Sequence, residues 1–195
     1  FSPLSFILGN FLLDLNMSLI SVIFLLYIFR KESKKYFFNL YFKFFFIISI
    51  YFFVNSIFSM NPLLSLESSL FYIRFVIFPL AIWYVIDQDQ RHLKQISKIF
   101  ISVYLFVIFD AFIQYFFNQN LFGFAYSGYR LSGVFGEELI LGSYLSRFFP
   151  LVCAFAIIVF DKKIKHIIFL GITYLLLDSL IYISGERVAF FYLIL

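Results

Sequence analysis

The strongest constraint on this chain is a series of apolar runs, each about as long as a membrane-spanning helix. Six of these runs cover approximately residues 12–29, 37–58, 66–86, 96–117, 139–160 and 166–183. A bilayer core of about 30 Å needs roughly 20 helical residues to span it, and lipid-exposed backbone has to satisfy its own hydrogen bonds by forming helices. Hydrophobic residues make up 63% of the chain and charged residues 13%, which leaves too little polar surface for a soluble domain. We therefore predict an all-α, polytopic transmembrane helical bundle.

Both ends of the chain fall in apolar stretches that are too short to cross a bilayer. We interpret residues 1–11 as the end of an earlier span and 188–195 as the start of a later one. No soluble domain, internal repeat or low-complexity linker interrupts the six runs. Residues 1–195 are therefore predicted to form a single transmembrane domain that is truncated at both ends.

Basic residues are concentrated in alternate loops, and this pattern predicts an orientation. Eleven of the fifteen Lys and Arg residues lie in or beside the loops at 30–35, 87–98 and 161–165, with Lys43 at the edge of its span. Loops rich in Lys and Arg stay in the cytoplasm. These three loops are therefore predicted to be cytoplasmic, and the loops between them to face outward.

The charges on the predicted outer side are of a different kind. All four basic residues there are arginines: Arg74, Arg130, Arg147 and Arg187. Seven acids map to the same side: Asp14, Glu67, Asp110, Glu137, Glu138, Asp178 and Glu186. Because arginine suits bidentate binding of phosphate or carboxylate, the set predicts a polar cavity that opens outward and holds an anionic head group. Structural ion pairs between helices are the alternative for any single residue, and snorkelling is the alternative for Asp14 and Asp178.

Arg74 and Arg147 lie within predicted spans, where an ionisable group costs about 2.5–3.5 kcal/mol near the helix centre. Each therefore needs a partner or a water-filled cavity. Each is followed by a proline, Pro79 or Pro150, that can bend the helix. Two pairs of polar residues are spaced to share one helix face: Glu67 with Arg74, and Asp110 with Gln114.

The densest polar segment on the predicted outer side covers residues 126–147. Three glycines break the loop before the next span and permit tight turns and close approach to a ligand: Gly128, Gly133 and Gly136. Glu137 and Glu138 come at the predicted start of that helix. A simple interaction with the helix dipole explains them about as well as a role in a binding site does. Gly142 and Ser146 form a small-residue face for helix packing. The second outer element is the turn at 184–187, for which a plain polar hairpin is the alternative.

No motif for zinc, nucleotide or dinucleotide binding occurs in the chain, and there is no nucleophile elbow. The single cysteine, Cys153, makes neither an internal disulfide nor a metal cluster. We therefore predict no metal and no cofactor. His92 and His166 lie in or beside predicted cytoplasmic loops, so they cannot serve an outward-facing site. The basic segment at 30–35 lies next to a span, so topology and anionic lipid explain it better than nucleic acid does.

Two outer segments carry a family resemblance. Arg130, Gly133, Phe135, Glu138 and Gly142 form the pattern R-x-x-G-x-F-x-x-E-x-x-x-G, and residues 184–189 read Ser-Gly-Glu-Arg-Val-Ala. Here the chain resembles the O-antigen ligase/polymerase family, the integral-membrane glycosyltransferases of bacterial surface polysaccharides. The upstream segments 71–75 and 110–115 are also similar to this family. Many members carry Ser or another small residue at the position of Glu186, so the second match is looser.

The resemblance implies a GT-C-like bundle of the bacterial inner membrane, with the C-terminal half of the family domain beyond this region. It implies a glycan carried on undecaprenyl diphosphate at the periplasmic face, and lipid A core or a growing glycan as acceptor. The residues implied to bind the diphosphate or the glycan are Arg130, Glu138, Arg147, Arg187 and Arg74, while Gly133, Phe135, Gly142 and Gly185 are implied to be structural. No catalytic residue is assigned.

Other classes of function remain open from the sequence. A transporter or flippase for polysaccharide or lipid-linked sugar is the main alternative, although transporters usually carry internal repeats and charges near the bilayer midplane. A non-catalytic membrane scaffold is the third class, and it would tolerate replacement of the outer arginines by Lys or Gln. Ligation and polymerisation are not separated by these motifs.

Overall fold

The computed structural model describes residues 10–30, 34–126, 128, 130–136, 138–160 and 163–194. These residues form helices joined by short turns and one longer loop, and their only β feature is an isolated antiparallel bridge between Gln119 and Ala125. The helices divide into two compact units, residues 1–90 and 91–195. The single domain predicted for residues 1–195 stays a prediction.

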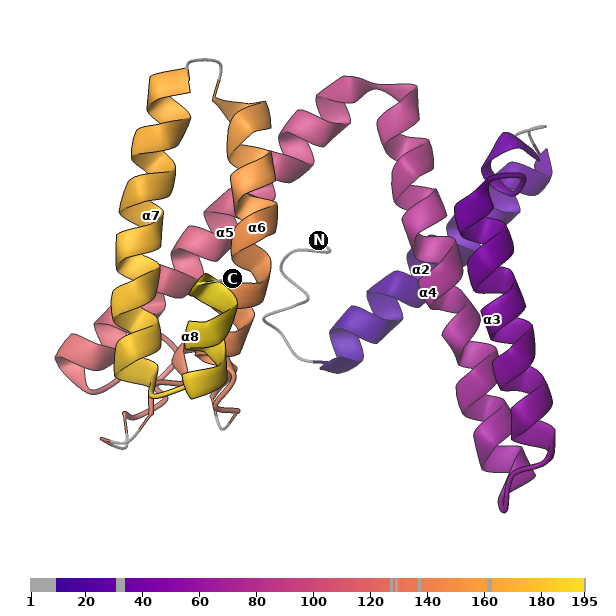
Figure 1. Ribbon diagram of the computed structural model, residues 1–195, viewed down its shortest axis with the longest axis horizontal. Helices are drawn as coiled ribbons and strands as arrows, with labels where there is room; N and C mark the ends of the chain where they lie inside the picture. The colour runs from indigo at the N-terminus through magenta and orange to yellow at the C-terminus, as the bar shows by residue number, and fades with distance from the viewer. Residues whose placement is uncertain are drawn as a thin grey trace. The chain divides into compact units, whose positions relative to one another are not determined.

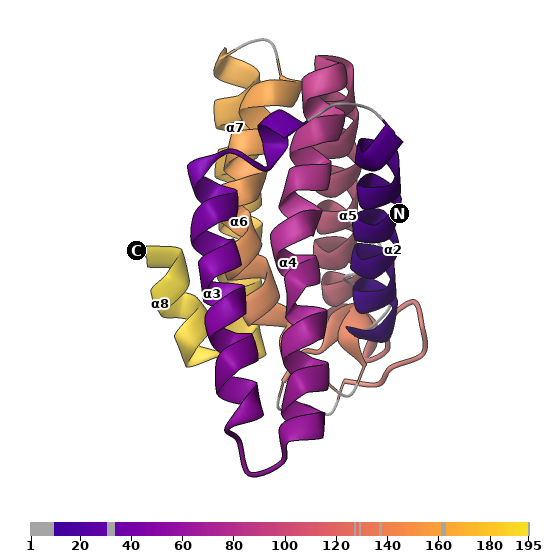
Figure 2. The ribbon, with the colours of Figure 1, turned by 90° about the vertical axis from the view of Figure 1, so that its right-hand side faces the viewer.

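The first unit holds helices α2 (Asn10–Arg30), α3 (Leu40–Ile57) and α4 (Pro62–Gln88), with the short 3-10 helix η1 (Lys34–Tyr36) between α2 and α3. Helix α4 packs against both α2 and α3 (Figure 1; Figure 2). Its core is a cluster of aromatic and aliphatic side chains: Phe24, Tyr36, Ile77, Leu80 and Ala81.

The ends of the helices in the first unit follow standard capping chemistry. The Asn39 side chain accepts a hydrogen bond of 2.7 Å from the backbone N–H of Phe42, which caps the start of α3. Pro62 occupies the first turn of α4, where a missing N–H costs nothing. The helix continues through Pro79. Proline therefore marks the start of α4 and does not end it.

The second unit contains most of helix α5 (Gln90–Phe117), then η2 (Gly133–Phe135), α6 (Leu141–Val159), α7 (Lys163–Ser184) and the short α8 (Arg187–Ile194). Helix α6 packs against α7 and α8 (Figure 1). It also contacts α5: the buried hydroxyl of Tyr104 on α5 donates a 2.7 Å hydrogen bond to the carbonyl of Leu145 on α6. Helix α6 therefore lies against every other long helix of this unit.

Among the described residues, six helices are long and apolar enough to cross a membrane: 11–28, 40–57, 62–88, 90–117, 141–159 and 163–184. This confirms the predicted all-α polytopic bundle with six spans. Helices α4 and α5 extend beyond their predicted spans of 66–86 and 96–117, because a helix does not have to end where its apolar stretch ends. The apolar segment at 188–195 begins within α8, while residues 1–9 lie outside the described part of the chain.

Candidate functional site

Most of the predicted site residues lie at one end of the second unit. There α5 ends, the loop of residues 118–140 begins, α6 starts, and the Gly185–Glu186 turn joins α7 to α8 (Figure 1, around α8). We call this region the loop end of the second unit. The geometry of the loop end is set by three buried or half-buried polar side chains on the helices and turn around it.

Asp110 is the first of these side chains. It is fully buried on α5. One carboxylate oxygen accepts the backbone N–H of Leu121 at 3.0 Å, and the other accepts the side-chain amide of Asn120 at 3.1 Å. Asn120 also donates to the carbonyl of Gly133 at 2.8 Å. Both oxygens of this acid are therefore engaged in holding the loop rather than turned to a ligand.

Gln114 lies one helical turn further along α5 and is also fully buried. Its carbonyl oxygen accepts two backbone N–H groups, from Ser132 at 3.1 Å and from Gly133 at 2.7 Å. Its amide donates to the hydroxyl of Ser132 at 3.2 Å and to the carbonyl of Phe124 at 3.3 Å. Burial of unpaired backbone groups is costly, and this one side chain satisfies several of them.

Two of the predicted structural residues, Gly133 and Phe135, lie in the same part of the loop. Gly133 has φ of +55°, and an added Cβ would lie 3.3 Å from a methyl group of Leu141, so glycine is favoured there on both counts. The ring of Phe135 packs against Tyr144 of α6 with centroids 5.1 Å apart. These contacts fix the 133–135 segment against the start of α6.

The two segments that carry the family resemblance meet at Gly142. An added Cβ on Gly142 would lie 2.9 Å from the Ser184 hydroxyl, 3.1 Å from the Glu186 carboxyl carbon and 3.2 Å from the Ala189 Cβ. Only a residue without a side chain allows α6 to approach the 184–189 segment this closely. Gly185 forms the turn between α7 and α8 with φ of +67°.

Glu186 is the third side chain that sets the geometry, and it caps helix α6 from a distance in sequence. Its carboxylate accepts the backbone N–H groups of Gly142 at 2.8 Å and Ser143 at 2.9 Å, and the Ser143 hydroxyl at 2.6 Å. These N–H groups have no partner within the helix, and a carboxylate at a helix N-terminus is stabilised by the helix dipole. Ile140, the residue before the helix, provides no side-chain cap.

The helix-dipole interpretation of Glu138 is wrong, because α6 begins at Leu141 and has no acid in its first turn. Glu138 is exposed and precedes the helix. Its carboxylate has no hydrogen bond or ion pair with the residues that the structure describes. Glu137 lies outside those residues.

Three of the predicted arginines belong to the loop end and are exposed: Arg130, Arg147 and Arg187. The guanidinium of Arg147 lies over the ring of Tyr192 of α8, 5.4 Å from its centroid, which is a favourable cation–π arrangement. Arg187 lines a groove of about 580 Å³ whose other walls include Tyr182, Phe190 and Phe191. The groove therefore places a cation beside aromatic side chains, an arrangement that suits a ligand with an anionic head group and an apolar tail.

Arg74 lies in the first unit and has a partner that the sequence did not reveal. Its guanidinium contacts the carboxylate of Asp14 on α2 at 2.9 Å. Arg74 also shares the lining of a pocket of about 480 Å³ with Glu67, which agrees with the common helix face predicted for these two residues. Asp14 therefore offsets part of the charge of Arg74, and Asp14 is not simply a snorkelling residue.

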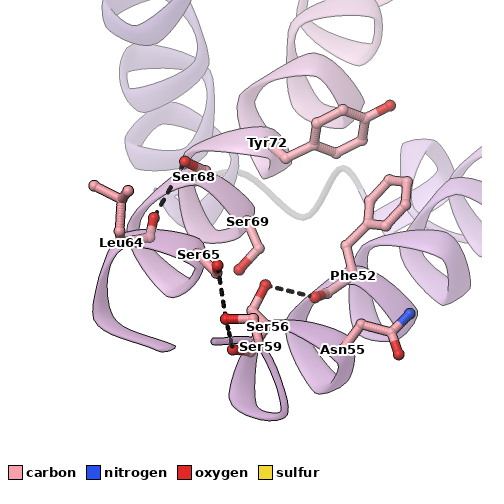
Figure 3. A pocket seen from close by; sticks show the side chains of 9 residues that line it. All are labelled: Phe52, Asn55, Ser56, Ser59, Leu64, Ser65, Ser68, Ser69 and Tyr72. Atoms are coloured by element: carbon pink, nitrogen blue, oxygen red, sulfur yellow. Dashed lines mark hydrogen bonds between the residues drawn. The ribbon is translucent and has the colours of Figure 1, made fainter. Parts of the chain in front are cut away.

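A hydroxyl-rich groove between α3 and α4 was missed by the sequence analysis. It has a volume of about 530 Å³ and is lined by five serines, Asn55 and Tyr72, among others (Figure 3). The sequence does carry a signal for this groove. Ser65, Ser68 and Ser69 are spaced to share one helix face, and a short turn separates them from Ser56 and Ser59.

At its opposite end the first unit is held by a polar cluster. The buried hydroxyl of Tyr36 donates to the Asp87 carboxylate at 2.7 Å, and Lys35 contacts the same oxygen. The bond to Asp87, followed by that to Tyr36, raises the pKa of Lys35 above its ordinary value. Burial raises the pKa of Tyr36. This cluster joins the predicted cytoplasmic loop to the end of α4.

The described part of the chain shows no group of three His, Cys, Asp or Glu side chains arranged to hold a metal ion. No protein-family model matches the chain, and no curated protein or solved structure matches it either. The six apolar helices identify a multi-pass membrane protein whose helices are suited to a lipid bilayer.

Proposed function

We propose that this chain belongs to a membrane glycosyltransferase that acts on undecaprenyl-diphosphate-linked glycan at the periplasmic face of the bacterial inner membrane, by O-antigen ligation or polymerisation. The observation that carries the proposal is the convergence at Gly142. The two segments that resemble the O-antigen ligase/polymerase family are 44 residues apart between Gly142 and Glu186, and they contact each other at the loop end of the second unit. A chance resemblance in two unrelated loops would not require such contact.

The exposed cations at the loop end support binding of a lipid diphosphate. Arg130, Arg147 and Arg187 present guanidinium groups that suit phosphate oxygens. The groove beside Arg187 adds aromatic walls that suit the apolar carrier. Arg74 is a weaker candidate for binding a diphosphate than sequence alone predicted, because Asp14 already engages one end of its guanidinium.

The proposed reaction transfers the glycan from its carrier to a hydroxyl group of the acceptor, which is lipid A core or another glycan. The acceptor oxygen forms a bond to the anomeric carbon, the bond from that carbon to the diphosphate oxygen breaks, and the hydroxyl proton is released. Undecaprenyl diphosphate leaves with the bonding electrons. Arginines that contact the diphosphate lower the barrier by stabilising the charge that develops on it.

Two acids on the predicted outer side hold the structure and are not proposed to take part in this chemistry. The carboxylate of Asp110 already accepts hydrogen bonds from the loop, and that of Glu186 accepts them from the start of α6. The Glu138 side chain is exposed and its carboxylate has no partner among the described residues, so it is the acid that we propose to contact the glycan hydroxyl groups.

The experiment uses the full-length protein in its own host, with Arg130 replaced by Ala or Lys and membrane expression confirmed. Surface polysaccharide is run on a gel beside its lipid-linked precursors. A cap of one repeat unit on the lipid core identifies a polymerase, while loss of capped lipid with long polymer on the carrier identifies a ligase. Arg130→Lys should recover only part of the activity, because Lys keeps the charge but not the planar pair of donors.

The matched control is Arg91→Ala, which removes an arginine at the other end of α5. Wild-type polysaccharide is expected for this control. A wild-type pattern for Arg130→Ala would contradict the proposed role of Arg130. Precursors trapped on the cytoplasmic side in a deletion strain would instead favour the flippase alternative.

A further inference from the structure

The hydroxyl-rich groove of the first unit, which we call the α3–α4 groove, offers several serine oxygens as hydrogen-bond acceptors. A serine hydroxyl has one proton and two lone pairs. Ser56 donates its proton to the carbonyl of Phe52 at 2.8 Å, and Ser69 donates to the carbonyl of Leu66 at 3.1 Å. Ser59 lies 3.0 Å from the Ser56 carbonyl and 2.8 Å from the Ser65 hydroxyl. With these protons engaged, the oxygens of Ser56, Ser59 and Ser69 present lone pairs to a ligand, while Asn55 and Tyr72 in the same lining can also donate.

Figure 3 shows the hydroxyl groups of Ser56, Ser59, Ser65 and Ser69 gathered in one region, with the rings of Phe52 and Tyr72 beyond them. The two rings pack edge to face with centroids 5.1 Å apart. The groove is therefore polar near the turn that joins α3 to α4 and aromatic further along the helices. A ligand that fits it has donor groups at one end and apolar character at the other.

The neighbouring pocket adds charges of both signs. It shares Leu64, Ser68 and Tyr72 with the α3–α4 groove and is also lined by Glu67 and Arg74. Arg74 contacts Asp14 at 2.9 Å, yet its Nε is enclosed and has no hydrogen-bond partner among the residues described. Two acids and one arginine leave one net negative charge. This disfavours a ligand as anionic as a diphosphate and favours a ligand that carries a cation as well as a phosphate.

The order of these groups along α4 matches the order of groups in a phospholipid. Glu67 and Ser65 lie within the first six residues of the helix, which begins at Pro62, and Arg74 follows Glu67 by seven residues, about 10 Å along the axis. In an ethanolamine phospholipid the ammonium is terminal, the phosphate is next, and the acyl chains lie deeper. We propose that the α3–α4 groove and its neighbouring pocket bind an ethanolamine phospholipid, with the ammonium among Glu67 and the serine oxygens and the phosphate at Arg74.

This site lies in a different unit from the proposed transferase site and does not depend on it. The other possible occupant of a serine-lined groove is a packed helix, because small polar residues favour close helix packing. The two occupants differ in one measurable respect. Only a lipid site discriminates between head groups that carry different numbers of N–H donors.

The test measures lipid affinity by native mass spectrometry of the whole delipidated chain in detergent. The lipids share their acyl chains and carry ethanolamine, its mono- and dimethyl derivatives, or choline, so N–H donors are removed one at a time while the net charge is kept. A hydrogen bond to a charged group contributes enough for about a tenfold difference in affinity or more. We expect a stepwise fall along this series, to roughly a tenth or less for choline. Glu67→Gln and Ser65→Ala should each remove most of that preference.

Two variants outside the groove serve as matched controls. Ser179→Ala removes another helix serine, whose hydroxyl donates to the carbonyl of Leu175, and Asp178→Asn removes another carboxylate; both should keep the preference. Equal affinity across the methylated series would overturn the proposal, as a groove covered by a helix predicts. A preference that survives both Glu67→Gln and Ser65→Ala would also overturn it. So would a phosphatidylglycerol that binds as tightly as the ethanolamine lipid.

Discussion

Helix serines bond within their own helix in both units, but the second unit adds buried or half-buried acids and an amide that hold the backbone of other segments. In the first unit, serines such as Ser18, Ser21 and Ser49 donate to the carbonyl four residues earlier in their own helix. In the second unit, Asp110, Gln114 and Glu186 bond to the backbone of other segments. The first arrangement hides polar atoms within a helix, whereas the second fixes one segment against another.

This difference shows where the chain builds a defined site. A helix that satisfies its own hydroxyl groups needs no particular neighbour. A loop whose backbone is held by buried side chains has one favoured geometry, because every unmade bond would leave a buried polar group without a partner. Functional groups need that kind of support to be held in place. The loop end of the second unit has this support for its loop and for the start of α6.

The largest expected effect comes from Gln114→Leu. This change leaves the backbone N–H groups of Ser132 and Gly133 without their acceptor, at a cost of about 2–5 kcal/mol in the free energy of unfolding. The measurement is unfolding of the protein in mild detergent by titration with sodium dodecyl sulfate. Gln119→Leu is the control, because Gln119 is exposed and bonds only to the Gly123 carbonyl among the described residues. Equal losses for the two variants would contradict the special role of Gln114.

Gly142→Ala is expected to have the next largest effect. The added methyl group meets Ser184, Glu186 and Ala189, and such overpacking costs about 1–3 kcal/mol. Gly171→Ala is a matched control within helix α7, since its added Cβ meets nothing within 4 Å, and it should be neutral or stabilising. The same titration measures both variants. A Gly142→Ala protein as stable as the Gly171→Ala protein would show that the two segments do not approach each other closely.

Glu186→Gln should cost less, about 0.5–2 kcal/mol, because one of the two acceptor oxygens remains to cap α6. Glu138→Gln removes an exposed carboxylate and should change the stability by less than about 0.5 kcal/mol. Thermal unfolding of both proteins side by side provides the comparison. The capping role is refuted if the two variants melt together.

The smallest effect is expected in the first unit, from Lys35→Met. The pKa of Lys35 is raised in the folded protein. Its contribution to the free energy of unfolding is therefore complete below the ordinary pKa of 10.5, and it is lost as the pH rises through the higher folded value. The stability difference between wild type and Lys35→Met should therefore shrink above about pH 10.5. The measurement is the free energy of unfolding of both proteins across an alkaline pH series. A difference that grows with pH would contradict the bond to Asp87.

Run length and charge predicted the number and order of the spans, because both follow from the chemistry of the bilayer. Run length and charge could not predict the hydrogen-bond partners at the loop end. Spacing placed Asp110 and Gln114 on one face of a helix, but their partners lie in a loop whose shape depends on those same bonds. Proximity in sequence suggested Glu138 as the cap of α6, whereas the cap is Glu186, 44 residues beyond Gly142. The Asp14 partner of Arg74 likewise comes from another helix.

The most direct test of the account is the side of the membrane on which the loop end lies. In the full-length protein with Cys153 and every other native cysteine replaced by Ala, single cysteines are introduced as Leu121→Cys, in the exposed loop, and as Gln95→Cys, near the start of α5. Intact cells are treated with a membrane-impermeant maleimide. The account predicts labelling of Leu121→Cys in intact cells, and labelling of Gln95→Cys only after the membrane is permeabilised. The reverse pattern would place the loop end in the cytoplasm and contradict glycosyl transfer at the periplasmic face.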